Sequence, residues 1–460
     1  MDKTIDNPMA TKPVRKIMIT MGVPMILSMM MQALYNIVDS AFIANIPDVG
    51  EQALNALTLA FPVQMLMIAV GIGTGVGVNA LTARSLGQGD SELASKAAGN
   101  GIFLSAIIYL VFLVFGLVGI DAYVGSQTSD PEIHSMCSDY LSICCIISFG
   151  VVFFPCFEKL LQSTGRSLFS TIAQVAGALT NIVLDPILIF GWLGLPAMGV
   201  VGAAWATVIG QIVSMVLGLV FHLRLNKEIK SGLRYIKPSL SVIKNIYSIG
   251  LPAIIAQALM SVMTYGMNII LVKIDPCVVT AYGLYYKIQQ FILFAAFGLR
   301  DAITPIVSFS FGMGSRRRVN DGIRFGVLYT IIIMAAGTIL LEALAQPFTA
   351  MFGLSGETAA VCVGAMRIIS LSFIFAGVNV ALQGVFQALN GGVESLIISV
   401  CRQFLFVLPV AWLFSLAAVD NFDNTWMVWL TFPIAELASM LIAILLMKRV
   451  SSKRLAVLGE

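Results

Sequence analysis

Three polar side chains recur along one face of the first long apolar segment of the chain. Gln32, Asn36 and Asp39 are separated by four and then three residues, so a helix would bring all three to the same side. An ionisable group inside an apolar segment is costly to bury and is commonly kept for a function. Carboxylate and amide oxygens suit a proton or a small hard cation. The first segment therefore carries a candidate ion site.

Two later apolar segments carry polar residues that can complete this site. Asn181 and Asp185 are four residues apart and share a helical face, and Thr207 lies early in the next segment. Segments one and five cross the membrane in one direction and segment six crosses it in the other. From the rise per residue of a helix, Asp39, Asn181, Asp185 and Thr207 then lie at similar depths in the bilayer. Two close carboxylates in a low dielectric resist joint ionisation and should share a proton. Asp39, Asn181, Asp185 and Thr207 are therefore predicted to bind a proton or Na⁺.

Both aspartates also have structural explanations. Asp39 lies near the end of its segment, where it could sit among lipid headgroups. Asp185 precedes Pro186, and a proline bends a helix and removes a backbone donor. Asp185 could therefore be a cap or hinge residue, a role that is compatible with ion binding.

Composition identifies the surroundings of these residues as membrane. The chain has 460 residues, of which 58% are hydrophobic and 11% charged, with a mean hydropathy of +0.92. A soluble domain carries about 25% charged residues, so we expect a multi-pass membrane protein that binds membrane lipid and no nucleic acid. The seven cysteines form no Cys-x-x-Cys, and the two histidines lie far apart. We therefore expect no cofactor, no metal cluster and no enzymatic activity.

Twelve apolar runs are long enough to cross a bilayer, which takes about 20 residues. They begin near Ile17, Ala53, Ala97, Ile133, Leu168, Val200, Val242, Val278, Ile323, Thr358, Leu396 and Trp426. Basic residues are concentrated in the N-terminal tail, in alternate connections and in the C-terminal tail, while the opposite connections are acidic. The positive-inside rule then places both termini in the cytoplasm and the protein in the cell membrane.

The two halves of the chain resemble each other at an offset near 225 residues. Gly22-Val23-Pro24 opens span one and Gly250-Leu251-Pro252 opens span seven, while Gln162 to Gly165 ends span four and Gln387 to Gly391 ends span ten. Six spans per half give a parallel repeat, as in transporters whose two bundles rock about a shared site. The predicted architecture is all-α, with two six-helix bundles related by a parallel pseudo-two-fold. The predicted boundaries are an N-terminal lobe 1–225, a basic linker 226–241 and a C-terminal lobe 242–460.

The second half carries no matching acidic residues in these spans. Leu408 stands where Asp185 stands in the first half, and Thr264 or Met267 matches Asp39. The charged site is therefore expected in the first half alone. The polar residues predicted to support a substrate cavity are Gln32, Asn36, Gln257, Asn379 and Gln383.

Three charged residues in span eight have no assigned role. Arg300 and Asp301 are neighbours in sequence, and because neighbours point in different directions on a helix, each is expected to pair elsewhere. Lys287 lies nearer the middle of the span. A lysine that faced a cavity would favour mixed or anionic substrates, and otherwise it is packed away.

The ordered set of motifs resembles the multidrug and toxic compound extrusion (MATE) transporters over nearly the whole chain, from Ile17 to about Lys448. The motifs are the Gly-x-Pro openings, the Gly-x-Gly connections, Gln32 to Asp39, Gln162 to Gly165, Asn181 to Pro186, and Gly202 to Thr207. The resemblance implies a monomeric secondary antiporter that exports small organic compounds, cationic or amphipathic, in exchange for inward H⁺ or Na⁺.

The same resemblance implies roles for particular residues. Asp39, Asn181, Asp185 and Thr207 match family positions linked to cation or proton binding. Some branches of the family carry acidic residues in spans seven and ten, but this chain has Gln257 and other neutral residues at those positions. The chain is therefore more similar to prokaryotic branches that rely on acidic residues of the first lobe.

Three other functions stay open at this point. A lipid-linked precursor flippase of the same superfamily would need a large cationic cavity, for which Lys287 and Arg300 are the available residues. A membrane-embedded enzyme would need clustered His, Asp or Glu, whereas His134 and His222 lie apart near span ends. A channel would conduct without depending on Asp39.

Overall fold

The computed structural model describes residues 7–351, 355–456 and 458, and within these ranges the regular structure is helical throughout. A chain in lipid must satisfy its backbone hydrogen bonds internally, which apolar helices do. Eight continuous helices are long and apolar enough to span a membrane: α2 (Val14–Ala44), α3 (Gly50–Gly87), α4 (Ser91–Val118), α8 (Ser167–Ile189), α9 (Gly199–Leu225), α11 (Leu240–Leu271), α12 (Pro276–Gly312) and α13 (Arg316–Met351).

Two further spans are built from several consecutive helical pieces. One consists of α16 (Gly392–Val400), a π-helical turn η2 (Cys401–Leu405) and α17 (Val407–Asp420); the other of η3 (Phe422–Asn424), α18 (Thr425–Trp429), α19 (Thr431–Val450) and a second π-helical turn η4 (Ser451–Leu455). The short helix α1 (Pro8–Thr11) precedes the first span, and three short elements connect later spans: α5 (Ile120–Gln127), η1 (Trp192–Gly194) and α10 (Leu233–Ile236).

Spans four and ten are broken in the middle. The pair α6 (Pro131–Ile146) and α7 (Phe149–Ser163) bends by 45°, and the pair α14 (Gly356–Ser370) and α15 (Phe373–Ala388) bends by 51°. With each pair counted as one span, the described residues contain twelve, and every predicted span begins within a few residues of a helix start. The predicted all-α membrane fold is confirmed, while the two breaks were not anticipated from the sequence.

The chain divides into two compact units. The first unit comprises Met1–Ala10 and Leu27–Ile254, and the second comprises Thr11–Ile26 and Ile255–Glu460. Helix α2 thus changes unit two residues after its internal Pro24, and α11 changes unit two residues after its internal Pro252. The lobe boundaries 1–225, 226–241 and 242–460 stay predictions.

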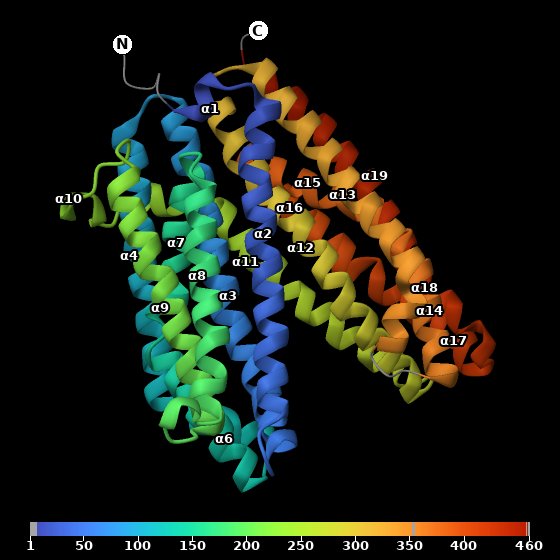
Figure 1. Cartoon of the computed structure of the whole chain (residues 1–460). Helices are drawn as coiled ribbons and strands as arrows, with labels where there is room; N and C mark the ends of the chain where they lie inside the picture. The colour runs from blue at the N-terminus through green and yellow to red at the C-terminus, as the bar shows by residue number, and fades with distance from the viewer. Residues whose placement is uncertain (1–6, 352–354, 457, 459–460) are drawn as a thin grey trace. The chain divides into compact units, whose positions relative to one another are not determined.

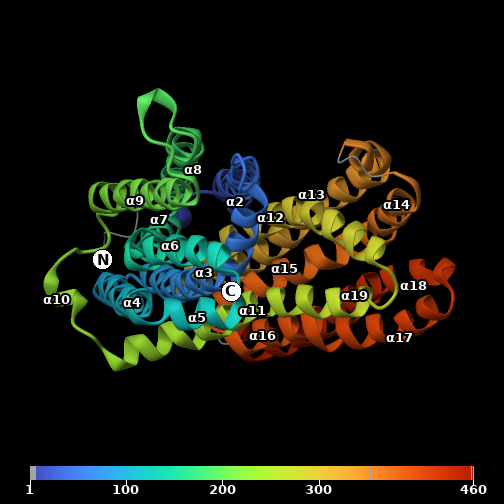
Figure 2. The same ribbon diagram turned by 90° about the horizontal axis from the view of Figure 1, so that it is seen from below.

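Within the first unit, α8 packs along α9, and α7 packs against both α3 and α9 (Figures 1 and 2). Turn residues from the sequence end and start these helices. Gly89 has a φ of 76° between α3 and α4, a conformation that suits glycine. Asp90 then caps α4 by accepting the Leu93 N–H.

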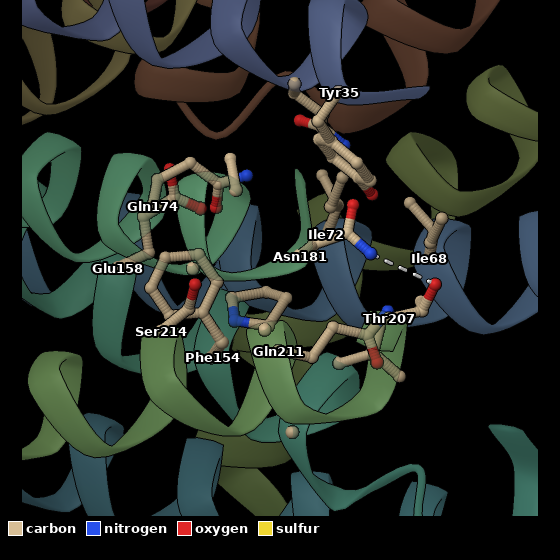
Figure 3. A pocket seen from close by; sticks show the side chains of 17 residues that line it. Tyr35, Ile68, Ile72, Phe154, Glu158, Gln174, Asn181, Thr207, Gln211 and Ser214 are labelled. Atoms are coloured by element: carbon tan, nitrogen blue, oxygen red, sulfur yellow. Dashed lines mark hydrogen bonds between the residues drawn. The ribbon is translucent and has the colours of Figure 1, made fainter. Parts of the chain in front are cut away.

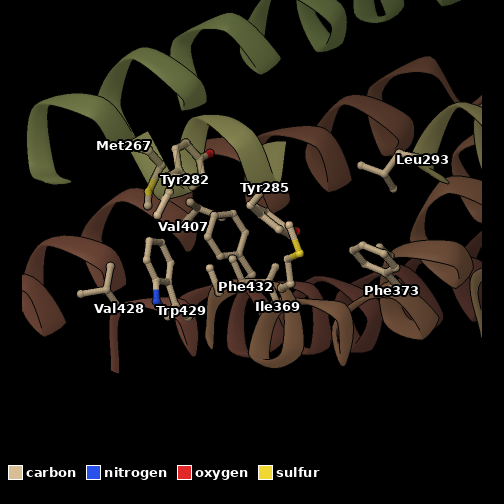
Figure 4. Close-up of a cluster of buried hydrophobic side chains, with 14 of the residues drawn as sticks. Met267, Tyr282, Tyr285, Leu293, Ile369, Phe373, Val407, Val428, Trp429 and Phe432 are labelled. Atoms are coloured by element: carbon tan, nitrogen blue, oxygen red, sulfur yellow. The ribbon is translucent and has the colours of Figure 1, made fainter. Parts of the chain in front are cut away.

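Within the second unit, α12, α13, α14 and α15 pack together. Figure 4 shows the aromatic core of this unit, in which Tyr282 of α12 stacks on Trp429 of α18 with an interplanar angle of 8° and on Phe432 of α19 with one of 24°. Stacked aromatic rings stabilise such a core by about 0.5–1.5 kcal/mol per pair beyond their buried area.

A candidate ion-binding site in the first unit

Helices α8 and α9 position most of the candidate site by approaching each other closely. A Cβ added at Gly177 of α8 would overlap the hydroxyl of Ser214 and lie 2.5 Å from the Gly210 carbonyl on α9. A Cβ added at Gly210 would lie 2.7 Å from the Gly177 carbonyl. This mutual contact is available only to glycine, and it brings Asn181 within reach of Thr207.

The structure gathers the four predicted ion-site residues. Asn181 Nδ2 is 3.4 Å from Asp185 Oδ1 and 3.5 Å from Thr207 Oγ1, while the side chain of Asp39 on α2 lies within hydrogen-bonding reach of Asp185. All four are buried, with Asp185 fully shielded from solvent. Residues from α2 and from the consecutive spans α8 and α9 therefore form one polar cluster.

The cluster has more acceptors than donors. Asp39 Oδ1, Asn181 Oδ1 and Asp185 Oδ2 are buried, and no described residue donates a hydrogen bond to them. An unsatisfied buried acceptor costs about 1–3 kcal/mol, and more when charged. Ionised carboxylates and amide oxygens only accept, so the three atoms have the chemistry to coordinate a small cation, or for two of them to share a proton.

A cavity of about 80 Å³ adjoins the cluster (Figure 3). Gln32, Asn181 and Thr207 line it, together with Tyr35 and Glu158. Asn36 is exposed and does not line this cavity. Its assignment to a substrate cavity stays a prediction.

Sequence reasoning missed two residues that line this cavity, Tyr35 and Glu158, and one beside the polar cluster, Tyr140. Tyr35 lies one helical turn before Asp39, a spacing that could have revealed it. Tyr140 of α6 accepts a hydrogen bond from Gln64 Nε2 at 3.0 Å, and no sequence pattern links it to the aspartates. Glu158 was overlooked because it lies close to the end of its span beside Lys159.

The predicted cavity residues of the second half belong to the second unit, where their amides already have partners. Asn379 Nδ2 donates to Glu436 Oε2 at 2.7 Å, and Gln383 Nε2 donates to Ser399 Oγ at 3.0 Å. The side chain of Gln257 is half-buried. The role of all three in substrate binding stays a prediction.

One expectation about charged residues was wrong. Arg300 and Asp301 pair with each other, with Arg300 Nη2 3.0 Å from Asp301 Oδ1, although sequence neighbours start from different sides of a helix. The long arginine side chain turns back, so that its Nε and Nη2 both reach one carboxylate oxygen. Lys287 is exposed.

Comparison with known proteins gives consistent matches. The family described as MatE matches residues 24–187 and 252–413, two stretches that begin at Pro24 and Pro252. The multidrug export protein MepA of Staphylococcus saprophyticus is 24% identical over 441 residues, covering 94% of each chain. MepA of Staphylococcus aureus (strain bovine RF122) is 26% identical over 450 residues, covering 95% of each.

Solved structures share the fold. An outward-facing multidrug resistance MATE family transporter of the MOP superfamily superposes with a TM-score of 0.90 at 23% identity, covering 98% of this chain and 100% of its own. A MOP superfamily transporter from Pyrococcus furiosus, described as having a binding pocket of reverse polarity, superposes with a TM-score of 0.88 at 24% identity, covering 98% and 99%.

Proposed function

Because this chain belongs to the MatE family of membrane transporters, which are not enzymes, we propose that it is a secondary antiporter exporting small organic compounds in exchange for inward H⁺ or Na⁺. The relatives are named multidrug export proteins, which supports cationic or amphipathic organic substrates and a place in the cell membrane. The basic tails support cytoplasmic termini. No cofactor is required, since the ion gradient supplies the free energy.

One observation carries the ion-coupling proposal. Asp39 Oδ1, Asn181 Oδ1 and Asp185 Oδ2 are buried acceptors that lack a donor among the described residues. Binding of a proton or Na⁺ relieves the energetic cost of these unpartnered oxygens, so the ion-bound form of the site is favoured. The coupling ion is therefore assigned to Asp39, Asn181, Asp185 and Thr207.

Coupling follows if ion and substrate stabilise opposite states. A ligand shifts a conformational equilibrium only by its differential affinity for the two states. Ion binding from outside would weaken substrate binding, and by reciprocity substrate binding from inside would expel the ion. The prolines Pro24 and Pro252, each two residues before a change of unit, are suitable positions for the bending that alternating access requires.

The lipid-linked precursor flippase is less well supported by the charges in span eight. It needs cationic side chains that are free to bind a pyrophosphate. Arg300 is already paired with Asp301 and lies over the ring of Phe297 at 4.9 Å. Its charge is therefore largely neutralised within the protein.

Efflux of ethidium from a bacterium that lacks its main drug pumps tests the proposal. Wild type is compared with Asp39→Asn and Asp185→Asn, with the proton and sodium gradients collapsed separately. We expect efflux to be lost in both variants, and the gradient whose collapse stops the wild type names the ion. Asp121→Asn, an exposed aspartate before span four, is the control. Dye retention by a well-expressed wild type would contradict multidrug export.

A further inference from the structure

The cavity beside the ion-site cluster continues beyond it to a third carboxylate. In Figure 3, Thr207 lies on one side of the view, Asn181 in the middle, and Gln174 and Glu158 on the other side. All four line the same cavity. The hollow therefore runs from Asn181 and Thr207 of the predicted ion site to Glu158 of α7, while Asp39 and Asp185 lie behind these two residues and do not line it.

Polar side chains follow this hollow along two helices. On α9, Thr207, Gln211 and Ser214 are spaced four and three residues apart and all line the cavity. On α8, Gln174 lines it and precedes Asp185 by 11 residues, a rise of about 16 Å. At about 15 Å³ of probe-occupied volume per water, a cavity of about 80 Å³ has room for a short water chain.

Glu158 is held in place by a neighbouring amide. It is 7% exposed, and Gln162 Nε2 donates to its Oε1 at 3.0 Å. Gln162 in turn accepts from Lys159 Nζ at 3.0 Å. Soon after, Gly165 ends this span, and a Cβ added there would lie 3.3 Å from Met9 Cγ. Glu158 therefore lies at the end of the first unit where the N-terminal residues pack, which the basic tail predicts to be cytoplasmic.

The internal repeat shows that this hollow is not imposed by the fold. At the offset of 225 residues, Gln211-x-x-Ser214 of α9 matches Glu436-x-x-Ser439 of α19. In the second unit, Arg402 Nη2 lies 2.7 Å from Glu436 Oε1, so a paired cation contacts the position of α19 that matches the cavity-lining Gln211 of α9. The matching position to Glu158 is Gln383, which is neutral.

We propose that Glu158 is a second binding site for the coupling cation, on the cytoplasmic side of the Asp39–Asp185 site. The cation reaches Glu158 along this cavity and leaves from there to the cytoplasm. For a proton, the Asp39–Asp185 pair loses the proton to a water that enters between Asn181 and Thr207, a cavity water gives one to the Glu158 carboxylate, and Glu158 releases it to bulk water. For Na⁺, the ion moves between the same carboxylates without any bond being broken. The inference rests on the proposed antiport function and deepens it.

The test uses the purified full chain in liposomes, with two assays on each variant. Ethidium-for-ethidium exchange needs no net ion movement and reports an intact carrier. Net ethidium transport is driven by a pH gradient alone or by a Na⁺ gradient alone. We expect Glu158→Gln to exchange within about twofold of wild type and to lose net transport by about tenfold or more.

Two further variants complete the design. Glu132→Gln, an exposed glutamate in the same broken span, should match wild type in both assays. Glu158→Asp, which keeps a carboxylate, should recover a large part of the net rate.

Each alternative outcome has a distinct meaning. A wild type that exchanges ethidium but ignores both gradients contradicts the antiport function itself. If the wild type is driven by a gradient and Glu158→Gln shows the same net transport, the proposed cation site at Glu158 is overturned. Loss of exchange together with net transport in Glu158→Gln assigns the residue a structural role and also overturns it. A Glu158→Asp variant that exchanges normally but is no faster than Glu158→Gln in net transport contradicts the need for a carboxylate.

Discussion

Arg402 and Glu436 form a buried ion pair within the second unit, with Arg402 Nη2 2.7 Å from Glu436 Oε1. Arg402 Nε also contacts both carboxylate oxygens, at 3.0 and 2.8 Å. Asn379 donates to the same carboxylate. The arginine lies in the π-helical turn Cys401–Leu405, where the extra residue per turn changes the direction in which its side chain points.

Removing one partner of this ion pair should destabilise the protein. Arg402→Met leaves Glu436 buried without its counter-charge, which typically costs about 3–5 kcal/mol. The double variant Arg402→Met with Glu436→Leu removes both charges and should recover most of the loss. Thermal unfolding in detergent measures both. Equal melting temperatures for wild type and Arg402→Met would show that the pair contributes no stability.

Binding of the coupling ion should stabilise the folded protein. An ion that binds only the native state at 100 times its dissociation constant adds about 2.7 kcal/mol. If the ion is Na⁺, replacing choline by Na⁺ at constant ionic strength should raise the melting temperature of wild type and leave that of Asp185→Asn unchanged. Asp121→Asn should respond as wild type does. An unaltered Na⁺ response in Asp185→Asn would remove this residue from the site, and a wild type insensitive to Na⁺ would favour H⁺ as the coupling ion.

The contact between α8 and α9 should tolerate no side chain at Gly177. An added methyl group overlaps the Ser214 hydroxyl and approaches the Gly210 carbonyl at 2.5 Å, so Gly177→Ala should destabilise by about 1–3 kcal/mol. It should also impair ion coupling, because Asn181 and Thr207 would separate. Gly283→Ala is the control, as no described atom lies within 4 Å of its added Cβ. It should be neutral or stabilise by about 0.5–1 kcal/mol.

The prolines of α2 and α11 should matter for turnover more than for stability. Pro24→Ala and Pro252→Ala restore a backbone N–H in the helix interior, where proline is unfavourable by about 3 kcal/mol. We expect melting temperatures equal to or above that of wild type, together with slower substrate exchange in liposomes, because a helix without proline bends less readily at each change of unit. A variant that melts higher and exchanges at the wild-type rate would exclude a hinge at that proline.

The sequence alone determined the number and class of the membrane spans. Apolar runs in lipid have one common backbone solution, the helix, so the twelve runs and their turn residues could be assigned without coordinates. Spacing along single helices also identified Asp39, Asn181 and Asp185, because residues three or four apart share a face by geometry. The offset of 225 residues revealed the repeat for the same reason, since it compares local patterns.

Only the tertiary structure decided which faces meet. Glycine contacts between α8 and α9 bring Asn181 to Thr207, and no local pattern specifies the partner of a helix. The breaks in spans four and ten occur without proline or glycine at Ile147-Ser148 or Leu371-Ser372. The pairing of Arg300 with Asp301 and the hollow that reaches Glu158 likewise depend on side-chain conformations and on packing across helices far apart in sequence.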